Sequence, residues 1–333
     1  MHHRYTALVP SPISARFITN WTSAAGALEG ILSDLGAALP RHAIMGLTGH
    51  AWHTCLGTRG GVTALPSGPT DLDWARMAAA YQRAGVAFES YLDLLNPGDG
   101  WVPGRDRAIA WAISRLDAGT PVIGWDFQLH EFAVVYGYDA QRRGFLVDGV
   151  YGPEFGPFTS WDDWPSSLGE LRLFAPLGPV DTDPIELVVE ALHAAIDCFA
   201  GHDGPLDGQP RGTAAFQAWA DALDGETEVD RAGNAYTLAV TQAARLDGAA
   251  FLRDVAEAIP DVAVPIGVAE RAIHAQATAL SPLITLFPFP TGGHGNVNNQ
   301  GLRRAAAMAL RRAARHETEA SAALTAALDI LDG

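Results

Sequence analysis

The sequence predicts an α+β domain with an antiparallel sheet, followed by a domain built only of helices. Three short segments of β type follow one another closely between residues 121 and 148, which is typical of an antiparallel sheet. Beyond residue 184, apolar residues recur at helical spacing almost to the end of the chain. The run 176–184 is rich in proline and glycine and separates the two parts. We therefore place the domains at residues 1–180 and 181–333.

The first domain is expected to begin with a helix over residues 23–35. Four aliphatic residues fall on one face of this helix, and it is followed by Gly36, a residue type that favours helix C-termini. The last two predicted strands are joined by a turn. The remaining predicted elements are helices over 74–95 and 105–118 and strands over 121–125, 132–138 and 144–148.

The second domain is expected to be a helical bundle or a helical cap on the first domain. The loop 286–299 between its last two helices contains glycine and proline, and is either an ordered cover or a plain connector. The predicted helices span residues 184–200, 211–223, 231–258, 262–281 and 300–331. The last helix carries arginines at 303, 304, 311, 312 and 315. We interpret them as a solvated face, and an anion-binding face is the alternative.

Composition excludes several classes of protein. The chain has 333 residues, 48% of them hydrophobic and 18% charged, which is enough apolar material for a sizeable core. All 22 positive residues are arginine, so chemistry that requires a lysine amine, such as a Schiff base or a Walker-type phosphate loop, is excluded. The net charge of −16 argues against a nucleic-acid partner.

The sequence indicates a cytoplasmic protein. No stretch of eighteen apolar residues occurs, so no membrane span is expected. The first residues lack the apolar run and the cleavage site of a secretory signal. Two cysteines, Cys55 and Cys198, lie far apart and suggest neither a disulfide framework nor a zinc-ligand spacing, which fits a reducing compartment.

A histidine and an aspartate lie on neighbouring predicted strands. His130 stands at the start of one strand, and Asp148 ends the next one. On paired antiparallel strands these side chains can approach each other. A carboxylate that accepts a hydrogen bond from one imidazole nitrogen orients the ring and raises its basicity. The pattern therefore predicts a base and the group that orients it.

These residues resemble a known group of enzymes. The segment from Gly119 through Pro121–Ile123 and His130 to Asp148 resembles the histidine half of papain-like cysteine peptidases of the bacteriocin-processing type. The predicted helix that begins at Ser23 is similar to their nucleophile helix, with serine in place of cysteine. The two-part layout and the segment Gly46–Trp52 are similar to the butirosin biosynthesis protein H group. That group transfers acyl groups from a carrier protein to an amine.

The resemblance implies a papain-like first domain in a bacterial protein of secondary metabolism. It implies roles for Ser23 as nucleophile, His130 as base, Asp148 as orienting group and Asn20 as oxyanion donor. A serine hydroxyl is not held ionised by an imidazolium as a thiol is, so it needs a general base during attack. Ser23 is therefore either a nucleophile or a helix-capping residue, and Asn20 is either a donor or a loop residue.

One geometric test follows from strand alternation. Successive side chains of a regular strand point to opposite faces, so His130 and Glu131 cannot both face one site. If Glu131 faces the site, the catalytic interpretation fails. We also expect Trp52, Trp125, Asp126 and Glu131 to bind a ligand in a polar pocket with apolar walls. The alternative for the two acids is that they satisfy turn amides.

No metal ion and no cofactor is expected. His50, His53 and Cys55 occur close together, but no fourth ligand follows at an ordinary spacing. Cys55 does not begin an apolar-periodic helix, so it lacks the helix N-terminus that would activate a thiol. Cys198 lies in an apolar helical stretch and is expected in the core.

Three hypotheses about function remain. As an enzyme, the protein performs acyl or aminoacyl transfer or amide hydrolysis on a small molecule, with an acyl carrier protein as a possible partner. As a binding protein, it retains the papain-like fold without catalysis and holds a metabolite or peptide in an aromatic-lined cleft. As a scaffold, it self-associates through its alanine-rich helices as a homo-oligomer.

Overall fold

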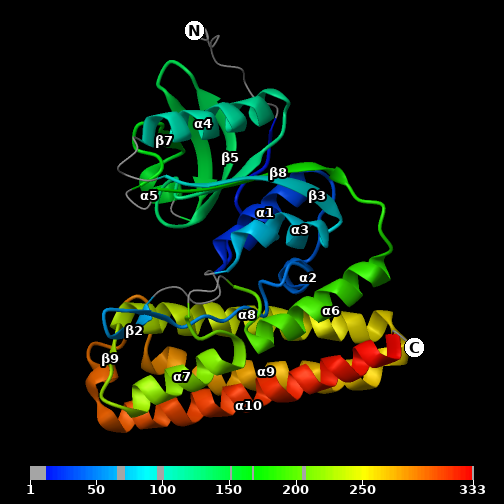
Figure 1. Ribbon diagram of the computed structural model, residues 1–333, viewed down its shortest axis with the longest axis vertical. Coiled ribbons are helices and arrows are strands. Elements are labelled where there is room, and N and C mark those ends of the chain that lie inside the picture. Colours follow the sequence, from blue (N-terminus) through cyan, green and yellow to red (C-terminus); the bar gives the residue numbers. More distant parts are fainter. Residues whose placement is uncertain are drawn as a thin grey trace. The chain divides into compact units, whose positions relative to one another are not determined.

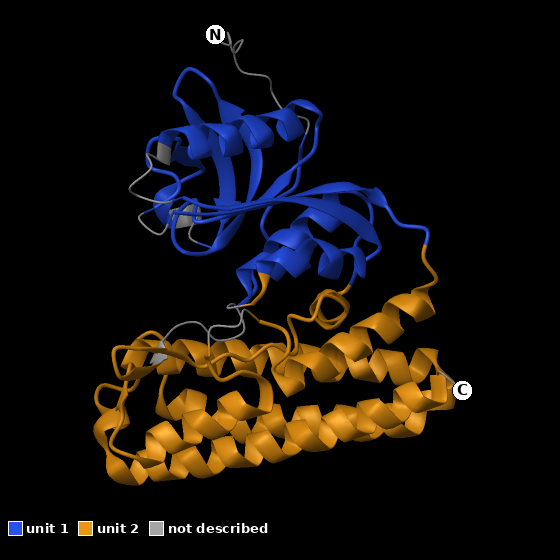
Figure 2. Ribbon diagram, in the orientation of Figure 1, with its two compact units in different colours: residues 1–39, 74–181 blue, residues 40–73, 182–333 orange. Residues whose placement is uncertain are grey.

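The computed structural model describes residues 13–65, 72–95, 101–150, 152–166, 169–204 and 208–331. The chain forms two compact units (Figure 2): residues 1–39 and 74–181 make unit 1, and residues 40–73 and 182–333 make unit 2. Unit 1 contains a six-stranded antiparallel sheet, and unit 2 is mostly helical. The expected mixed class, with an antiparallel sheet and a helical C-terminal region, is therefore confirmed.

The sheet of unit 1 has the strand order β3-β8-β4-β5-β6-β7, and all of its neighbouring strands are antiparallel. The three strands expected from the sequence are β4, β5 and β6, which are consecutive in the sheet. The strands are β3 (Val86–Leu94), β4 (Val122–Trp125), β5 (Phe132–Asp139), β6 (Gly144–Gly149), β7 (Phe158–Ser160) and β8 (Glu170–Pro179).

Two helices of unit 1, α1 (Ser23–Asp34) and α4 (Trp101–Asp117), pack against β4 and β5 (Figure 1). Helix α1 is also crossed closely by the chain that precedes it. A Cβ atom at Gly30 would lie 1.8 Å from the carbonyl oxygen of Arg16, and one at Gly26 would lie 2.3 Å from that of Ile18. The two glycines are therefore required for the backbone contact that holds residues 16–18 against α1.

The predicted helix over 74–95 is wrong. The structure has a 3-10 turn at Trp74–Arg76, helix α3 (Met77–Gln82) and then strand β3. The helix ends in a turn at Gly85, which has a φ of 86° and so adopts the left-handed conformation that glycine tolerates. The residues after it pair along their full length with β8. The apolar pattern of this segment was compatible with either structure, and sheet pairing decided between them.

Unit 2 contains the long helices, and α9 packs against both α8 and α10, while α7 packs against α10. A small sheet of β1 (Gly57–Arg59), β2 (Val62–Leu65) and β9 (Glu228–Val229) belongs to the same unit. The helices are α2 (Arg41–Leu47), α6 (Pro184–Ala200), α7 (Gly212–Asp224), α8 (Arg231–Ala258), α9 (Ala263–Leu286) and α10 (Gln300–Leu331). The short α5 (Gly152–Phe155) lies in unit 1. None of the helices among the described residues combines the length and apolar character that crossing a membrane requires.

The segment 40–73, which we expected in the first domain, belongs to unit 2. Trp52 is fully buried there and packs against Phe199 of α6 and Phe251 of α8. Arg245 of α8 donates to the carbonyl oxygen of Ala51 at 2.5 Å. These contacts join residues far apart in the sequence, so the sequence-based boundary near residue 180 marks only one of the points where the chain passes between the units.

The arginines of α10 do not form one solvated face. Arg303 is 8% exposed and donates hydrogen bonds to carbonyl oxygens of residues 222, 223, 225, 227 and 297. Two of these oxygens belong to the last turn of α7, where a cation compensates unpaired carbonyls and the helix dipole. Arg311 pairs with Asp221 and Asp224 of the same helix, at 2.9 and 3.0 Å. Through its hydrogen bond to the carbonyl oxygen of Val297, Arg303 also joins the loop before α10 to α7, within unit 2.

Candidate functional site

Ser23 is the first residue of α1, and its side chain is buried. Its hydroxyl donates to Oε2 of Glu131 at 2.5 Å and accepts from the backbone N–H of Phe132 at 3.0 Å. The N-cap position is occupied by Thr22, so the helix-capping alternative for Ser23 is wrong. Instead its hydroxyl joins the start of α1 to the start of β5, and both hydrogen bonds fix its orientation.

His130 belongs to a turn that precedes β5. Its Nδ1 atom lies 2.9 Å from Oδ1 of Asp126, and 56% of its side chain is exposed. Asp126 also accepts from the backbone N–H of Ser166 at 2.8 Å, and it adopts a φ of 67°. Its own backbone N–H donates to the carbonyl oxygen of Glu131 at 3.0 Å. Asp126 therefore closes the turn, and the alternative that acids satisfy loop amides holds for this residue.

The other two expected catalytic residues also have local partners. Asp148 accepts from the backbone N–H of Phe17 at 3.0 Å. Asn20 accepts from the backbone N–H of Thr22 at 3.0 Å, in a turn that leads into α1. The expected Ser23–His130–Asp148 triad is therefore not formed. It is Glu131 that reaches the serine, and this was the outcome under which the catalytic interpretation fails.

The expected ligand-binding residues belong to different units. Trp52 lies in the interior of unit 2, whereas Trp125 lies in unit 1. The imidazole of His130 stacks on Trp125, with ring centroids 6.3 Å apart. A small cavity of about 330 Å³ in unit 1 is lined by Trp74 and Arg172. The Arg172 guanidinium lies 5.2 Å from each of the Trp74 and Trp125 rings and pairs with Glu170 at 2.8 Å.

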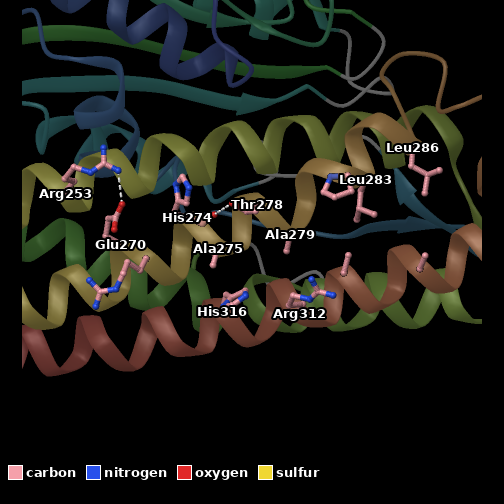
Figure 3. Close-up of a pocket in the computed structure, with 14 residues that line it drawn as sticks. Arg253, Glu270, His274, Ala275, Thr278, Ala279, Leu283, Leu286, Arg312 and His316 are labelled. Atoms are coloured by element: carbon pink, nitrogen blue, oxygen red, sulfur yellow. Dashed lines mark hydrogen bonds and ion pairs between the residues drawn. The ribbon is translucent and has the colours of Figure 1, made fainter.

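A larger groove of about 900 Å³ lies on unit 2 between α9 and α10 (Figure 3). It has two different ends, with Arg253 and Glu270 at one end and Leu283 and Leu286 at the other. Alanines form much of its floor, because their methyl groups leave space that longer side chains would fill. Its lining residues are Arg253 of α8, Glu270, Arg271, His274, Ala275, Thr278, Ala279, Pro282, Leu283 and Leu286 of α9, and Ala305, Ala309, Arg312 and His316 of α10.

The groove as a whole is cationic although the chain is acidic. Three arginines and two histidines line it, against a single glutamate. That glutamate, Glu270, is already paired with Arg253 at 2.9 Å. Within the part of the chain that the structure describes, neither Arg271 nor Arg312 has an ion-pair partner. The groove therefore offers two uncompensated guanidinium groups beside an apolar trough.

A second polar group in unit 2 brings together His53, Cys198 and Asp203, whose ligand atoms all lie within 4.8 Å of one another. Burial alone would raise the pKa of the Asp203 carboxyl. The hydrogen bond and charge of His53 and the charge of Arg211 outweigh that effect, so its pKa lies below the ordinary value. Cys55, which the sequence suggested as a neighbour of His53, instead pairs through its backbone with Arg211.

A comparison of the chain with models of known protein families gives no match, and neither does a comparison with curated protein sequences.

Sequence reasoning missed both features of unit 2. Arg271, His274 and Thr278 share one face of α9, and Arg312 and His316 share one face of α10, so each stripe was visible as a helical period. Only the packing of the two helices shows that these stripes border one groove. His53 and Cys198 are 145 residues apart, and no local spacing announces their contact.

Proposed function

We propose that this protein binds an anionic small molecule with an elongated apolar body, and that Ser23 performs no covalent chemistry on it. The single observation that supports the binding function is the groove of about 900 Å³ between α9 and α10, which is lined by three arginines together with apolar residues. Its volume is within the range of sites that hold small molecules. A carboxylate or phosphate head would meet Arg271 and Arg312, and the apolar body would cover Leu283 and the alanines.

The charge of the groove supports an anion rather than a neutral ligand. The chain carries a net charge of −16, so Arg271 and Arg312, which have no ion-pair partner among the described residues, run against the surrounding potential. Guanidinium groups form paired hydrogen bonds with carboxylates and phosphates, which adds direction to the charge attraction.

The absence of catalysis at Ser23 is supported by the contacts of its hydroxyl. A papain-like origin of unit 1 remains our proposal, supported by a helix that starts with Ser23 beside the strand that follows His130. In that arrangement Glu131 occupies the place of the base. The Ser23 hydroxyl is buried and is held by two hydrogen bonds, so it is not presented to a substrate as a nucleophile. We therefore propose that unit 1 has a structural role and has neither acyltransferase nor peptidase activity.

Calorimetric titration with dodecanoate tests the binding proposal. We expect saturable binding of dodecanoate and of dodecyl phosphate, and no binding of dodecyltrimethylammonium, which has the same tail with the opposite charge. Arg271→Gln and Arg312→Gln should each weaken binding about tenfold, the loss of one charge-assisted contact. Arg304→Gln is the matched control, because Arg304 is an exposed arginine of α10 that does not line the groove.

The apolar end has its own pair of variants. Ala309→Phe should block the groove, whereas Met308→Phe, at an adjacent exposed position outside the groove, should leave binding unchanged. Equal binding of the three dodecyl compounds, or equal affinities of Arg312→Gln and Arg304→Gln, would contradict the proposal.

An engineered pair tests the role given to Glu131. In the variant Ser23→Cys with Glu131→His, an imidazole faces a thiol at the start of a helix, and both features lower a thiol pKa. We expect this double variant to react with iodoacetamide at least about tenfold faster at neutral pH than Ser23→Cys alone. Equal rates of reaction would show that the side chain at position 131 does not affect the reactivity of a thiol at position 23. The Cys55 and Cys198 background is measured in the parent chain.

A further inference from the structure

Three side chains of different chemistry converge inside unit 2. His53 is 8% exposed, Cys198 is 1% exposed, and the side chain of Asp203 is 7% exposed. The Sγ atom of Cys198 lies 3.5 Å from Nδ1 of His53. A carboxylate oxygen of Asp203, Oδ2, contacts the same nitrogen. A thiol, an imidazole nitrogen and a carboxylate thus point at one volume.

The fold brings these groups together at the C-terminus of α6. Cys198 lies in the last turn of that helix, and Gly201 follows it with a φ of 77°, the left-handed conformation that ends many helices. The chain reverses its direction after this glycine, which brings the Asp203 carboxylate close to the Cys198 thiol. His53 comes from a segment fixed on both sides of the next residue, because Arg245 donates to Thr54 Oγ1 at 2.7 Å and Gly212 N–H donates to the Thr54 carbonyl at 2.9 Å.

Hydrogen bonding within the cluster does not satisfy these groups. A single imidazole nitrogen either donates one hydrogen bond or accepts one, yet Nδ1 of His53 is approached by two partners. The second oxygen of Asp203, Oδ1, is buried and has no hydrogen-bond partner among the described residues. A buried carboxylate oxygen without a partner is costly, and a cation held by the three groups would satisfy it.

We propose that His53, Cys198 and Asp203 bind a zinc ion. Thiolate, imidazole and carboxylate are the protein ligands of zinc. Two ligands of one tetrahedral zinc, one sulfur and one nitrogen, lie roughly 3.6 Å apart when the bond lengths are about 2.3 and 2.05 Å. The observed separation of 3.5 Å between Sγ and Nδ1 agrees with this geometry. Oδ2 of Asp203 lies closer to Nδ1 than two ligands of one zinc do, so the carboxylate has to move outward when the ion binds. The described residues provide three ligands in this cluster, and water or an exogenous ligand would complete the tetrahedron.

Metal analysis and cobalt substitution test the site. We expect the purified chain to hold one zinc per molecule, and the zinc-free chain to bind one Co²⁺ with a thiolate-to-metal charge-transfer band and the visible absorption of a tetrahedral ion. Cys198→Ala should abolish the charge-transfer band. Cys55→Ala is the matched control, because Cys55 is equally buried, and it should keep the band.

Asp203→Asn provides a second test in case Cys198→Ala does not fold, because it keeps the shape of the side chain. We expect it to weaken cobalt binding at least about tenfold, within the range known for altered metal sites, while the circular dichroism spectrum stays that of the parent. The proposal is overturned if excess Co²⁺ produces no charge-transfer band in the folded parent chain. It is also overturned if the band persists in Cys198→Ala, or if Asp203→Asn binds cobalt as tightly as the parent.

Discussion

Two buried polar clusters of unit 2 adjoin at consecutive residues, His53 and Thr54, and they are built in different ways. Around Arg245, which is fully buried, each guanidinium nitrogen has an acceptor in Gln276, Ala51, Thr54 or Glu317. Around His53, two partners share one nitrogen, and a carboxylate oxygen of Asp203 has no hydrogen-bond partner among the residues that the structure describes.

The two clusters differ in whether the protein itself satisfies their buried polar groups. The Arg245 cluster satisfies its own groups and joins α8, α9, α10 and the segment 51–54, so it needs nothing else. The carboxylate of Glu317 is likewise fully occupied, because it also accepts from Thr213 at 3.0 Å and from Gln276 at 3.3 Å. The His53 cluster is complete only with an added cation. Ser23 and Glu131 of unit 1 belong to the first type, since the serine hydroxyl both donates and accepts.

The largest effect is expected from breaking the Arg245 cluster on one side. Glu317→Leu leaves a buried guanidinium without its carboxylate, which should lower the free energy of unfolding by about 3–5 kcal/mol. The double variant Arg245→Met with Glu317→Leu should recover at least about half of that loss, because it removes both charges. Urea unfolding followed by tryptophan fluorescence measures both. A double variant less stable than the single one would mean that the hydrogen bonds, and not the buried charge, dominate.

Removal of the metal should have the next largest effect. Zinc at one hundred times its Kd stabilises the folded chain by about 2.7 kcal/mol, so a chelator should lower the unfolding midpoint accordingly. The same chelator should not shift the midpoint of Cys198→Ala. If both proteins shift equally, the chelated ion is bound elsewhere in the chain.

A smaller effect is expected at Ser23. Ser23→Ala leaves the Glu131 carboxylate and the Phe132 N–H without the shared hydroxyl, at a cost of about 1–3 kcal/mol in the free energy of unfolding. Ser33→Ala, at an exposed position of the same helix, should change it by less than about 0.5 kcal/mol. Hydrolysis of an activated acyl ester should be the same in the parent and in Ser23→Ala. A burst of product that disappears in the variant would restore the catalytic hypothesis.

The smallest effect on stability is expected in the groove. Arg312→Gln should change the free energy of unfolding by less than about 0.5 kcal/mol, because Arg312 is exposed and has no ion-pair partner among the described residues. Its effect should be confined to binding of dodecanoate, which distinguishes a binding residue from the structural Arg303. A destabilisation as large as that of Arg303→Met, measured alongside it, would show that Arg312 also supports the fold.

Much of the fold could be predicted from the sequence. The five helices of the second part begin and end within a few residues of α6 to α10, because long amphipathic periods and capping residues such as Asp183 are local signals. The central strands were equally visible. The helix expected over 74–95 failed because β3 depends on β8, a strand about eighty residues later.

The candidate site was less predictable. The sequence showed a serine at a helix start and an acid next to His130. Strand alternation could not decide which of the two neighbours reaches the serine, because both lie in the turn before β5 that Asp126 closes. The arginines of α10 show the same limit, since Arg303, Arg311 and Arg312 look alike in sequence and have three different environments.

The sequence by itself determined three properties of the protein. It excluded chemistry that needs a lysine amine, it predicted the mixed fold class with an antiparallel sheet, and it predicted the helical second part. Each follows from composition or from periodicity over neighbouring residues. Only the tertiary structure decided that Glu131 binds Ser23, that segment 40–73 joins the helices, and that His53 meets Cys198 and Asp203. Those contacts join distant residues, and their free energy comes from burial and hydrogen bonding that exist only after the chain has packed.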